Sequence, residues 1–504
     1  MNSEPLDFDK MVVDTKIAEA YLEKHPELKD PTLTEYTPKH LFVMSSTDKL
    51  QEKLVLLASL INEKKQLFCQ LEYLIRGIPV KEVEDYDLKL LINNLLYHGL
   101  CCLQIDIDQS LKTPRLVMGD NTPLVNLGWI AQILMAEYSE PIIYATKKTA
   151  AICTLFVDLC HGVELPKITL EITDVLENDK FLNLGKIKEL QNGCTGIITR
   201  RSDIESAVDQ FLHAPTTNPW AVHNIYVEES AVERFKRAIS WKTSRVPESL
   251  EVISSLCTEA YYYEGKLFLY EYAGDTRTDK HVFIHSYRTV KDLLNIIEPS
   301  LSVSLWSCDV AESNEIAARL KSDIIWINDL GNFNGTPRTS QSFYSLLRLP
   351  HGTIKTSITP DIQKLMKLQT EWVKEDVFVR RNAVLNFMDW KKQNINLEMD
   401  DFVDVGKSYV CTGRTLPVGL IYNYNDNHDL ISVLGSIVRG NGVIMYSKRK
   451  RTSPLYDHLI KIGAPILFLE QELVASDDGD LTVYNSFVYR TKVVWTSYGT
   501  IFAN

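Results

Sequence analysis

The residues that could carry covalent chemistry in this chain are few and lie far apart. Nine cysteines are scattered through 504 residues, and none forms a Cys-x-x-Cys pair or another spacing typical of a metal site. Cys101 and Cys102 are adjacent, and adjacent cysteines rarely form a disulfide. The odd count and the scattering favour a reduced, intracellular protein, for which we predict no metal ligands.

One turn lies where many enzymes place a nucleophile, shortly before a strand. The stretch APTTNPWAVHNIYVEE, residues 214–229, opens with prolines and threonines and continues into a predicted strand, Asn224–Val227. The turn contains neither cysteine nor serine. Thr216 and Thr217 offer hydroxyl groups, but a threonine nucleophile needs a strong base beside it. The sequence therefore raises the question of what this turn does.

Composition and charge exclude several classes of protein. A hydrophobic fraction of 45% and a charged fraction of 24% are typical of a globular chain, here of about three domains. The net charge of −12 argues against nucleic acid or an anionic membrane as a partner. The short basic runs Ile198–Ser202 and Tyr446–Thr452 are typical of solvated loops. We predict neither a secretory signal nor a membrane span, and therefore a cytoplasmic location.

Helical and strand patterns alternate along the chain, which is typical of an α/β fold with parallel strands. In such sheets a ligand lies at the carboxyl ends of the strands. The clearest segments of the first half are an amphipathic helix over Asp48–Glu72, helices over Tyr86–Tyr97, Leu124–Glu137 and Ala150–His161, and a strand over Pro141–Thr146.

The same order of elements begins again in the second half. Gly331–Pro360 is rich in Gly, Pro, Ser, Thr and Asn, and indicates a linker or a surface crossing. Behind it we predict a helix over Asp376–Asn396, a strand over Leu416–Asn425, a helix, and a strand over Gly440–Ser447. This repetition indicates one full copy of a supersecondary pattern followed by a truncated second copy.

Several of these stretches, taken in order, resemble the aldehyde dehydrogenase superfamily. QEKLVLLASLINEKKQLFCQLEYLIRGIPVKEVEDYDLKLLINNLLYHG is similar to its amino-terminal helices, and DNTPLVNLGWIAQIL to its Asn-aromatic-Pro-Leu turn. ELQNGCTGIITRRSDIESAVD resembles the Glu-Leu-Gly-Gly segment, NIYVEESAVERF the strand and helix after the nucleophile, and SDIIWINDLGNF the Trp-Val-Asn strand. LPVGLIYNYN, GNGVIMYSKRKRTSP and TKVVWTSYGT resemble parts of the same family a second time, a layout similar to the family-16 branch.

This resemblance implies an α/β fold with a Rossmann-type nucleotide domain, an α/β former catalytic domain and a partial second nucleotide-type domain. The expected boundaries are an amino-terminal extension over 1–35, a degenerate nucleotide-binding-like domain over 36–190, the former catalytic domain over 191–345, a linker over 346–374, and the truncated second nucleotide domain over 375–504.

The family oxidises aldehydes through a cysteine thiohemiacetal, hydride transfer to a nicotinamide, and thioester hydrolysis by a Glu-activated water. Its nucleophile falls on Pro219, which has no sulfur, no hydroxyl and no backbone N–H for an oxyanion hole. Trp220 would crowd the substrate tunnel, and Cys194 is expected to be a buried small hydrophobe. Asn121 matches the oxyanion-hole asparagine and Glu189 the general base, and we interpret both as vestigial because they have no nucleophile to serve.

The cofactor positions also depart from the family. Tyr144 aligns with the lysine that contacts the ribose, and Lys147 with the acidic residue after it. The Gly-Ser turn that meets the pyrophosphate is absent from the first copy and reads Ser497-Tyr498-Gly499 in the second, where a tyrosine would obstruct the approach of a phosphate. We therefore expect no cofactor, or NAD or NADP if one binds.

The sequence predicts a catalytically inactive, aldehyde-dehydrogenase-like protein that acts as a binding, assembly or regulatory partner. The expected assembly is a homodimer or a hetero-assembly with a related protein, without nucleic acid or membrane. The alternative is an NAD(P)-dependent oxidoreductase that acts on aldehydes and uses Glu189 and Asn121 without a thiol.

Overall fold

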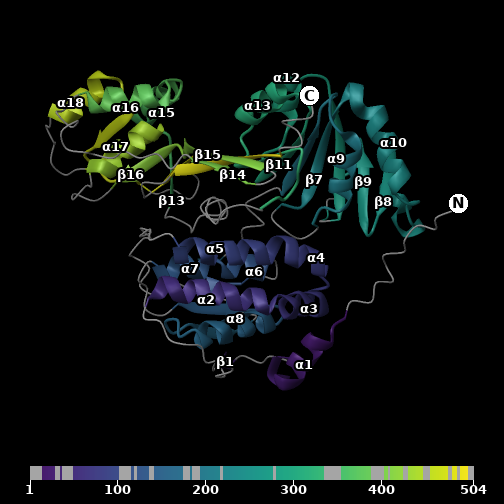
Figure 1. The fold of residues 1–504 in the computed structure, drawn as a ribbon. Helices are drawn as coiled ribbons and strands as arrows, with labels where there is room; N and C mark the ends of the chain where they lie inside the picture. The colour runs from purple at the N-terminus through teal and green to yellow at the C-terminus, as the bar shows by residue number, and fades with distance from the viewer. Residues whose placement is uncertain are drawn as a thin grey trace. The chain divides into compact units, whose positions relative to one another are not determined.

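The structure is a computed structural model, and it divides the chain into two compact units (Figure 1). The larger unit comprises Met1–Tyr344, Asp404–Cys411 and Val494–Asn504, and the smaller comprises Ser345–Val403 and Thr412–Val493. The residues that the structure describes are 14–28, 34–36, 49–100, 115–118, 122–135, 141–173, 182–183, 193–215, 220–275, 278, 280–333, 353–386, 402–406, 409–423, 430–446, 454–474, 479–484 and 489–497.

The larger unit begins with a group of helices. The predicted helix over Asp48–Glu72 is two helices, because Lys64, with ψ of 10°, separates them. Within the extension expected over 1–35, a short helix is tied to the group, since the Gln70 side chain accepts from the backbone N–H of Ala18 at 3.2 Å. The helices are α1 (Lys16–Lys24), α2 (Leu50–Glu63), α3 (Lys65–Arg76), α4 (Val80–Glu82), the π-helical turn η3 (Val83–Asp87) and α5 (Leu88–Leu100).

A further helix, α8, lies between these helices and a five-stranded sheet and is buried on nearly all sides. The sheet order is β1-β4-β3-β2-β5, with β1 antiparallel and the others parallel, which is a Rossmann-type path. Nearly every residue of α8 is buried, since it contacts β3 and β4 as well as α2 and α3. The elements are β1 (Thr34–Tyr36), β2 (Arg115–Val117), α6 (Pro123–Leu127), α7 (Trp129–Met135), β3 (Ile142–Ala145), α8 (Ala150–Gly162), β4 (Thr169–Ile172) and β5 (Leu182–Asn183).

A ten-stranded sheet forms most of the rest of the larger unit. Its order is β14-β15-β20-β12-β11-β6-β7-β10-β9-β8, and the strands from β12 to β9 are parallel. The strands are β6 (Cys194–Ile198), β7 (Val222–Glu228), β8 (Glu259–Tyr263), β9 (Lys266–Tyr270), β10 (His281–Tyr287), β11 (Ser302–Trp306), β12 (Ile324–Ile327), β14 (Phe402–Val405), β15 (Tyr409–Pro417) and β20 (Tyr489–Ser497).

Short capped helices connect the parallel strands of this sheet. Asp203, Thr289 and Asp309 each accept a backbone N–H at the start of a helix, as N-cap residues do. The helices are α9 (Ile204–Leu212), α10 (Val232–Lys242), α11 (Glu251–Ser254), α12 (Val290–Ile296) and α13 (Val310–Arg319). One apolar core joins Leu293 of α12 and Ile316 of α13 to Ile197, Val303 and Ile325 of the sheet. The predicted α/β class with parallel sheets is confirmed.

The smaller unit contains a second five-stranded sheet, of order β13-β19-β16-β17-β18. The path β19-β16-β17-β18 matches β5-β2-β3-β4 of the first sheet, and in both cases the strands are parallel. The elements are β13 (Thr353–Thr356), α15 (Pro360–Trp372), α16 (Val377–Leu385), β16 (Leu420–Asn423), α17 (Leu430–Arg439), β17 (Gly442–Tyr446), α18 (Pro454–Lys461), β18 (Ile466–Leu469) and β19 (Leu481–Tyr484).

The sequence predicts a linker over 346–374, whereas the structure has a strand and a helix within this segment. This segment holds β13 and α15, and α15 buries Ile362, Leu365 and Trp372 on one side. Thr359 caps the helix by accepting the Ile362 N–H at 3.3 Å. The turn-rich composition before Pro360 concealed this amphipathic stripe, and the segment is part of the smaller unit.

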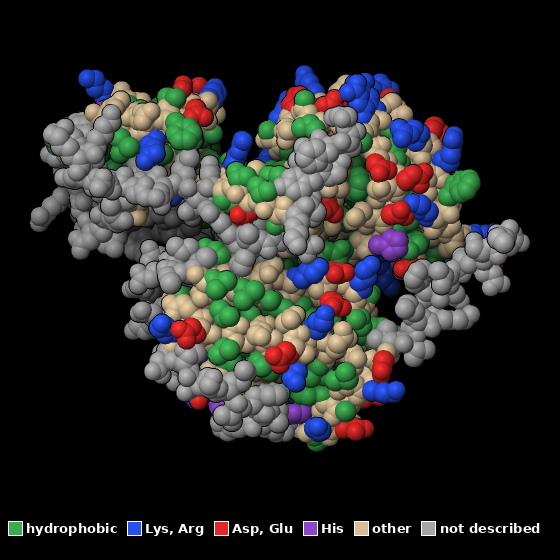
Figure 2. All heavy atoms as spheres, in the orientation of Figure 1, with side chains coloured by type: hydrophobic (Ala, Val, Ile, Leu, Met, Phe, Trp, Pro, Cys, Tyr) green, Lys and Arg blue, Asp and Glu red, His purple; other side chains and the backbone are tan. Residues whose placement is uncertain are grey.

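On the face shown in Figure 2, basic and acidic side chains are interspersed over the described surface of the larger unit. Among the described helices, none combines the length and the apolar content that a membrane span requires.

Two glycines with positive φ, Gly193 and Gly265, allow a test of the close backbone packing at the start of β6. Gly193 has φ of +65°, and a Cβ on it would lie 2.4 Å from the Ala221 carbonyl oxygen. Gly265 has φ of +84°, but no heavy atom lies within 4 Å of its Cβ position. We expect Gly265→Ala to lower the free energy of unfolding by about 1 kcal/mol through backbone strain alone. Gly193→Ala adds a clash, typically about 1–3 kcal/mol more. Equal losses in urea titrations of the two variants would contradict this packing.

Candidate functional site

The three residues predicted from the family's catalytic site fall in segments that the structure does not describe. Pro219 lies in 216–219, together with Thr216 and Thr217, Asn121 lies in 119–121, and Glu189 lies in 184–192. The positions of these side chains therefore stay predictions. The structure describes the residues that flank these three segments, which are 118 and 122, 183 and 193, and 215 and 220.

The segments that flank Glu189 and Pro219 are bonded to each other at the amino ends of β6 and β7. The Cys194 N–H donates to the Ala221 carbonyl at 2.8 Å, and the contact is as close as it is because residue 193 is glycine. Asn121 is followed by Thr122, whose φ of +46° turns the chain into Pro123, the first residue of α6. Thr122 and Pro123 are both buried.

Directly after Pro219, the Trp220 side chain is fully buried in a cluster of aromatic rings. Its ring lies 5.0 Å from Phe333 and 6.1 Å from Tyr86, measured between centroids. Phe333 in turn lies 5.5 Å from Trp326 and 6.0 Å from Trp495. We call these five residues the aromatic cluster. It joins Trp220, just before β7, to η3, to β12 and to β20.

A hydrogen bond positions one member of the aromatic cluster, and close packing against a glycine positions another. The Trp326 indole N–H donates to the Asn332 carbonyl at 3.0 Å. Gly331, with φ of +64°, lets Tyr86 approach so closely that a Cβ there would lie 2.5 Å from its ring. Burial raises the pKa of Tyr86 to about 12, so its hydroxyl keeps its proton at neutral pH.

A buried lysine holds the chain that leads into the same turn. Lys266, the first residue of β9, is 8% exposed and donates from Nζ to the carbonyls of Leu212, at 2.8 Å, and Ala214. These carbonyls lie at the carboxyl end of α9, where helical C=O groups lack partners within the helix. Burial lowers the pKa of Lys266 to about 8, while the negative charges of Glu82 and Glu264 act in the opposite direction.

The buried cysteines of the described residues include Cys69, Cys153, Cys160 and Cys194. Burial raises the pKa of Cys194 and of Cys69 to about 12, and it also raises that of Cys153 and Cys160. Since the thiolate is the reactive form, these thiols are inert at neutral pH. Cys194 is fully buried at the start of β6, and the prediction that it is a buried small hydrophobe is confirmed.

The residues aligned with the family's cofactor contacts lie at the carboxyl end of β3. Tyr144 is half-buried on that strand, and its carbonyl accepts the Met118 N–H at 2.8 Å. Lys147 is exposed in the turn that follows. Below it, the Thr146 N–H donates to the Thr149 hydroxyl at 3.0 Å, which closes the turn before α8. The structure thus brings Tyr144 and Lys147 to one strand end.

Lys266 and the contact partners of Trp220 were not found from the sequence. The sequence pattern that could indicate it is a lysine directly before the apolar run LFLY. In the structure this lysine begins a strand in which every residue is buried. Phe333 and Trp495 are separated by more than 150 residues, and nothing in local periodicity indicates that their rings meet.

Comparisons with known proteins gave matches among solved structures only. No family model and no curated protein matches the chain. Betaine aldehyde dehydrogenase from Staphylococcus aureus, in complex with NAD+, is similar at 16% identity and a TM-score of 0.46, over 63% of this chain and 79% of that one. PnpE from Pseudomonas sp. WBC-3 is similar at 16% identity and a TM-score of 0.45, over 56% and 77%.

Truncation of Trp220 tests the aromatic cluster. Trp220→Ala removes a fully buried indole, and such changes typically lower the free energy of unfolding by about 3–5 kcal/mol. Trp241→Ala is the matched control, because that indole is 85% exposed on α10 and should change stability by less than about 0.5 kcal/mol. Denaturant unfolding of both variants measures the difference. A Trp220→Ala loss no larger than that of the control would show that the cluster is loosely packed.

Lys266 predicts a pH dependence of stability. Its pKa is about 8 in the folded chain and about 10.4 in an unfolded one, so the unfolded state binds more protons between these values. The stability of the natural protein relative to Lys266→Met should therefore rise from pH 8 to pH 10.5, by up to about 3 kcal/mol. Lys280→Met, at an exposed lysine, should show no such rise. Parallel pH profiles for all three proteins would exclude a depressed pKa at Lys266.

Proposed function

We propose that this chain is a diverged member of the aldehyde dehydrogenase superfamily that no longer performs the family's reaction and works as a binding, assembly or regulatory partner. The observation that carries the proposal is the burial of Trp220. This indole directly follows Pro219, the residue aligned with the nucleophile, and it packs against Phe333 and Tyr86. Packing of this kind around the residue next to the aligned position supports a structural role there.

The chemistry of the turn supports the same proposal. Proline has no atom that can form a thiohemiacetal with an aldehyde, so the covalent step of the family has no nucleophile at Pro219. It also lacks the N–H that would stabilise the oxyanion. The nearest described thiol along the chain, Cys194, is fully buried with a raised pKa and cannot substitute for it.

The cofactor positions support a chain that does not use a dinucleotide. A nicotinamide accepts a hydride from the substrate in the family's reaction, and the named relative from Staphylococcus aureus was solved with NAD+. Here Tyr144 stands where a lysine would contact the ribose. The Thr149 hydroxyl accepts the backbone N–H of Thr146 in the turn before α8. No glycine lies in 146–149 to allow a phosphate close to that backbone. These residues do not fit a dinucleotide.

A role in assembly is supported by the second sheet. Its parallel strands β19-β16-β17-β18 follow the path of β5-β2-β3-β4, which supports our interpretation of the smaller unit as a truncated second copy. None of the residues aligned with the family's catalytic site, Asn121, Glu189 and Pro219, belongs to the smaller unit. We propose that it contributes surface instead, in a homodimer or in a complex with a related protein.

Calorimetric titration of the purified chain with NAD and NADP tests the proposal directly. We expect no saturable heat with either dinucleotide, and no formation of NADH or NADPH when aldehydes are added. An active aldehyde dehydrogenase measured in the same buffers serves as the control for cofactor and substrate quality. Aldehyde-dependent reduction above a protein-free blank would contradict inactivity. If that turnover were lost in Glu189→Gln, the result would support an oxidoreductase that works without a thiol.

A further inference from the structure

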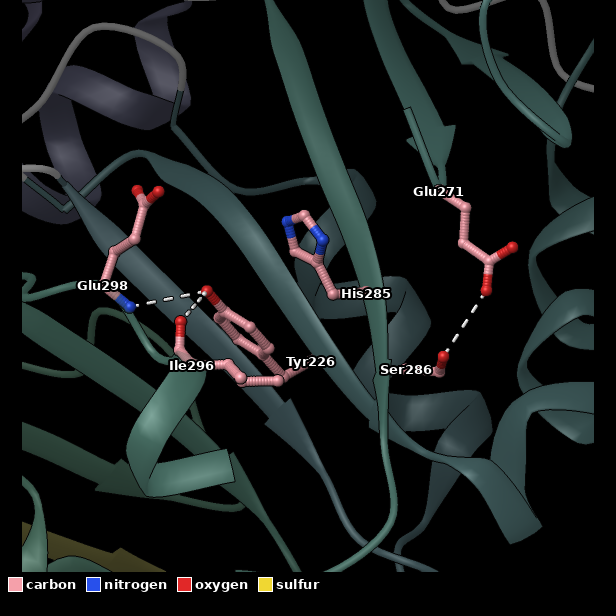
Figure 3. Close-up of a pocket in the computed structure, with 6 residues that line it drawn as sticks. All are labelled: Tyr226, Glu271, His285, Ser286, Ile296 and Glu298. Atoms are coloured by element: carbon pink, nitrogen blue, oxygen red, sulfur yellow. Dashed lines mark hydrogen bonds between the residues drawn. The ribbon is translucent and has the colours of Figure 1, made fainter. Parts of the chain in front are cut away.

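A cavity of about 310 Å³ in the ten-stranded sheet is divided by β10 and does not form one site (Figure 3). On one side of this strand, the Ser286 hydroxyl donates to the carboxylate of Glu271 at 3.5 Å. On the other side, the ring of Tyr226 stacks on His285, and its hydroxyl accepts the Glu298 N–H at 3.4 Å. The polar groups on each side are engaged within the protein, and the two sides share no common lining for one ligand.

A charged group without a partner is buried in the smaller unit instead. Arg380 and Val384 are the buried residues of α16, and they lie one turn apart on the same face of this helix. Val384 belongs to an apolar cluster with Val433 and Ile437 of α17. The side chain of Arg380 is 8% exposed, and its Nε and Nη1 are both buried with no hydrogen-bond partner among the described residues. A buried guanidinium without compensation is strongly unfavourable, so this position calls for an anion.

The guanidinium of Arg380 lies against the carboxyl end of α17, just beneath the surface. Gly440 directly follows this helix, and a Cβ on it would lie 2.3 Å from Nη1 of Arg380. The absence of a side chain at Gly440 therefore makes room for the guanidinium. The same Cβ position lies 3.0 Å from Cγ2 of Val373, whose side chain is 37% exposed. A small molecule that covers Val373 would therefore lie next to the guanidinium.

The backbone carbonyls at this end of α17 are engaged by other donors. The Ile437 carbonyl accepts the indole N–H of Trp372 at 2.8 Å, and the Gly440 carbonyl accepts the side-chain amide of Gln369 at 2.9 Å. The last carbonyls of a helix have no partner within the helix, and a nearby arginine often satisfies them. Here two side chains of α15 do so, and the N–H groups of Arg380 are left without this role.

The surroundings of Arg380 select a carboxylate among the possible anions. A guanidinium binds a planar carboxylate through parallel N–H donors, and arginine keeps its charge at neutral pH even though burial lowers the pKa of Arg380. Asp376, at the start of the same helix, already brings one negative charge near Arg380. A phosphate dianion would add two more charges beside it, next to the apolar side chains of Val373 and Val384. A single carboxylate with an alkyl chain matches both the charge and the apolar neighbours.

We propose that the smaller unit binds a small aliphatic monocarboxylate, whose carboxylate pairs with the guanidinium of Arg380 and whose alkyl chain covers Val373. The ion pair would compensate the buried charge, which accounts for an arginine on the core-facing side of α16. All residues of this site belong to the smaller unit, and none of them is aligned with the family's nucleophile, general base or oxyanion-hole asparagine. The proposal therefore does not rest on the inactivity of the protein.

The test is isothermal titration calorimetry of the full chain with sodium butyrate at constant ionic strength. We expect saturable binding of one butyrate per chain. Butyramide, a neutral molecule of the same shape, should give no saturable heat, and inorganic phosphate should bind more weakly than butyrate. Arg380→Met should weaken butyrate binding by about tenfold or more, because it removes the charged donors and keeps an unbranched side chain in the core.

Lys364→Met is the matched control, because it removes one positive charge from an exposed position on α15 in the same unit. It should leave the affinity for butyrate unchanged. In urea without butyrate, Arg380→Met should unfold at a midpoint no lower than that of the natural protein, since an unpaired buried charge does not stabilise the fold. A lower midpoint would identify the guanidinium as a structural group and overturn the proposal. Absence of butyrate binding, binding that survives in Arg380→Met or falls equally in Lys364→Met, or tighter binding of phosphate would also overturn it.

Discussion

The larger unit is organised around the burial of Trp220. Its indole contacts Phe333 and Tyr86, and through Phe333 it is connected to Trp326 and Trp495, so four separate segments of the chain meet at one group of rings. Large aromatic side chains remove more apolar area from water than any others, and they prefer the tilted and edge-on arrangements seen here. Lys266 adds a polar restraint to the segment that leads into the turn. These contacts fix the described residues on the two sides of segment 216–219, with Ala214 before it and Trp220 after it.

The contrast between a site and a core explains much of the chain's chemistry. A catalytic turn needs an exposed nucleophile, an N–H aimed at a developing oxyanion and room for a substrate. The resemblance aligns Pro219 with the nucleophile, and Trp220, the next residue, is fully buried. The described thiols of Cys69, Cys153, Cys160 and Cys194 are buried and protonated.

Periodicity predicted the type of most elements but not the contacts between them. The sequence predicts a strand at 141–146 and a helix at 150–161, and the structure has β3 and α8 there. The helix expected over 48–72 is divided at Lys64, which no glycine or proline marks. The sequence predicts a linker over 346–374, but this segment contains α15. Proline and threonine are typical of a crossing, whereas here Thr359 caps the helix and Pro360 begins its first turn. Lys266, Phe333 and Trp495 act through partners distant in sequence, which a local pattern does not encode.

The shared path of the two five-stranded sheets has a consequence for how the chain reaches its native state. Similar units in one polypeptide are prone to exchange strands while they fold. The pairings β2–β3 and β16–β17 place Ile142 and Gly442 at corresponding positions, opposite Arg115 and Leu420. A Cβ at Gly442 would lie 2.5 Å from the buried Leu420 side chain. An isoleucine brought there by a misplaced β3 would overfill the second sheet, so sequence divergence between the two sheets discriminates against the wrong pairing.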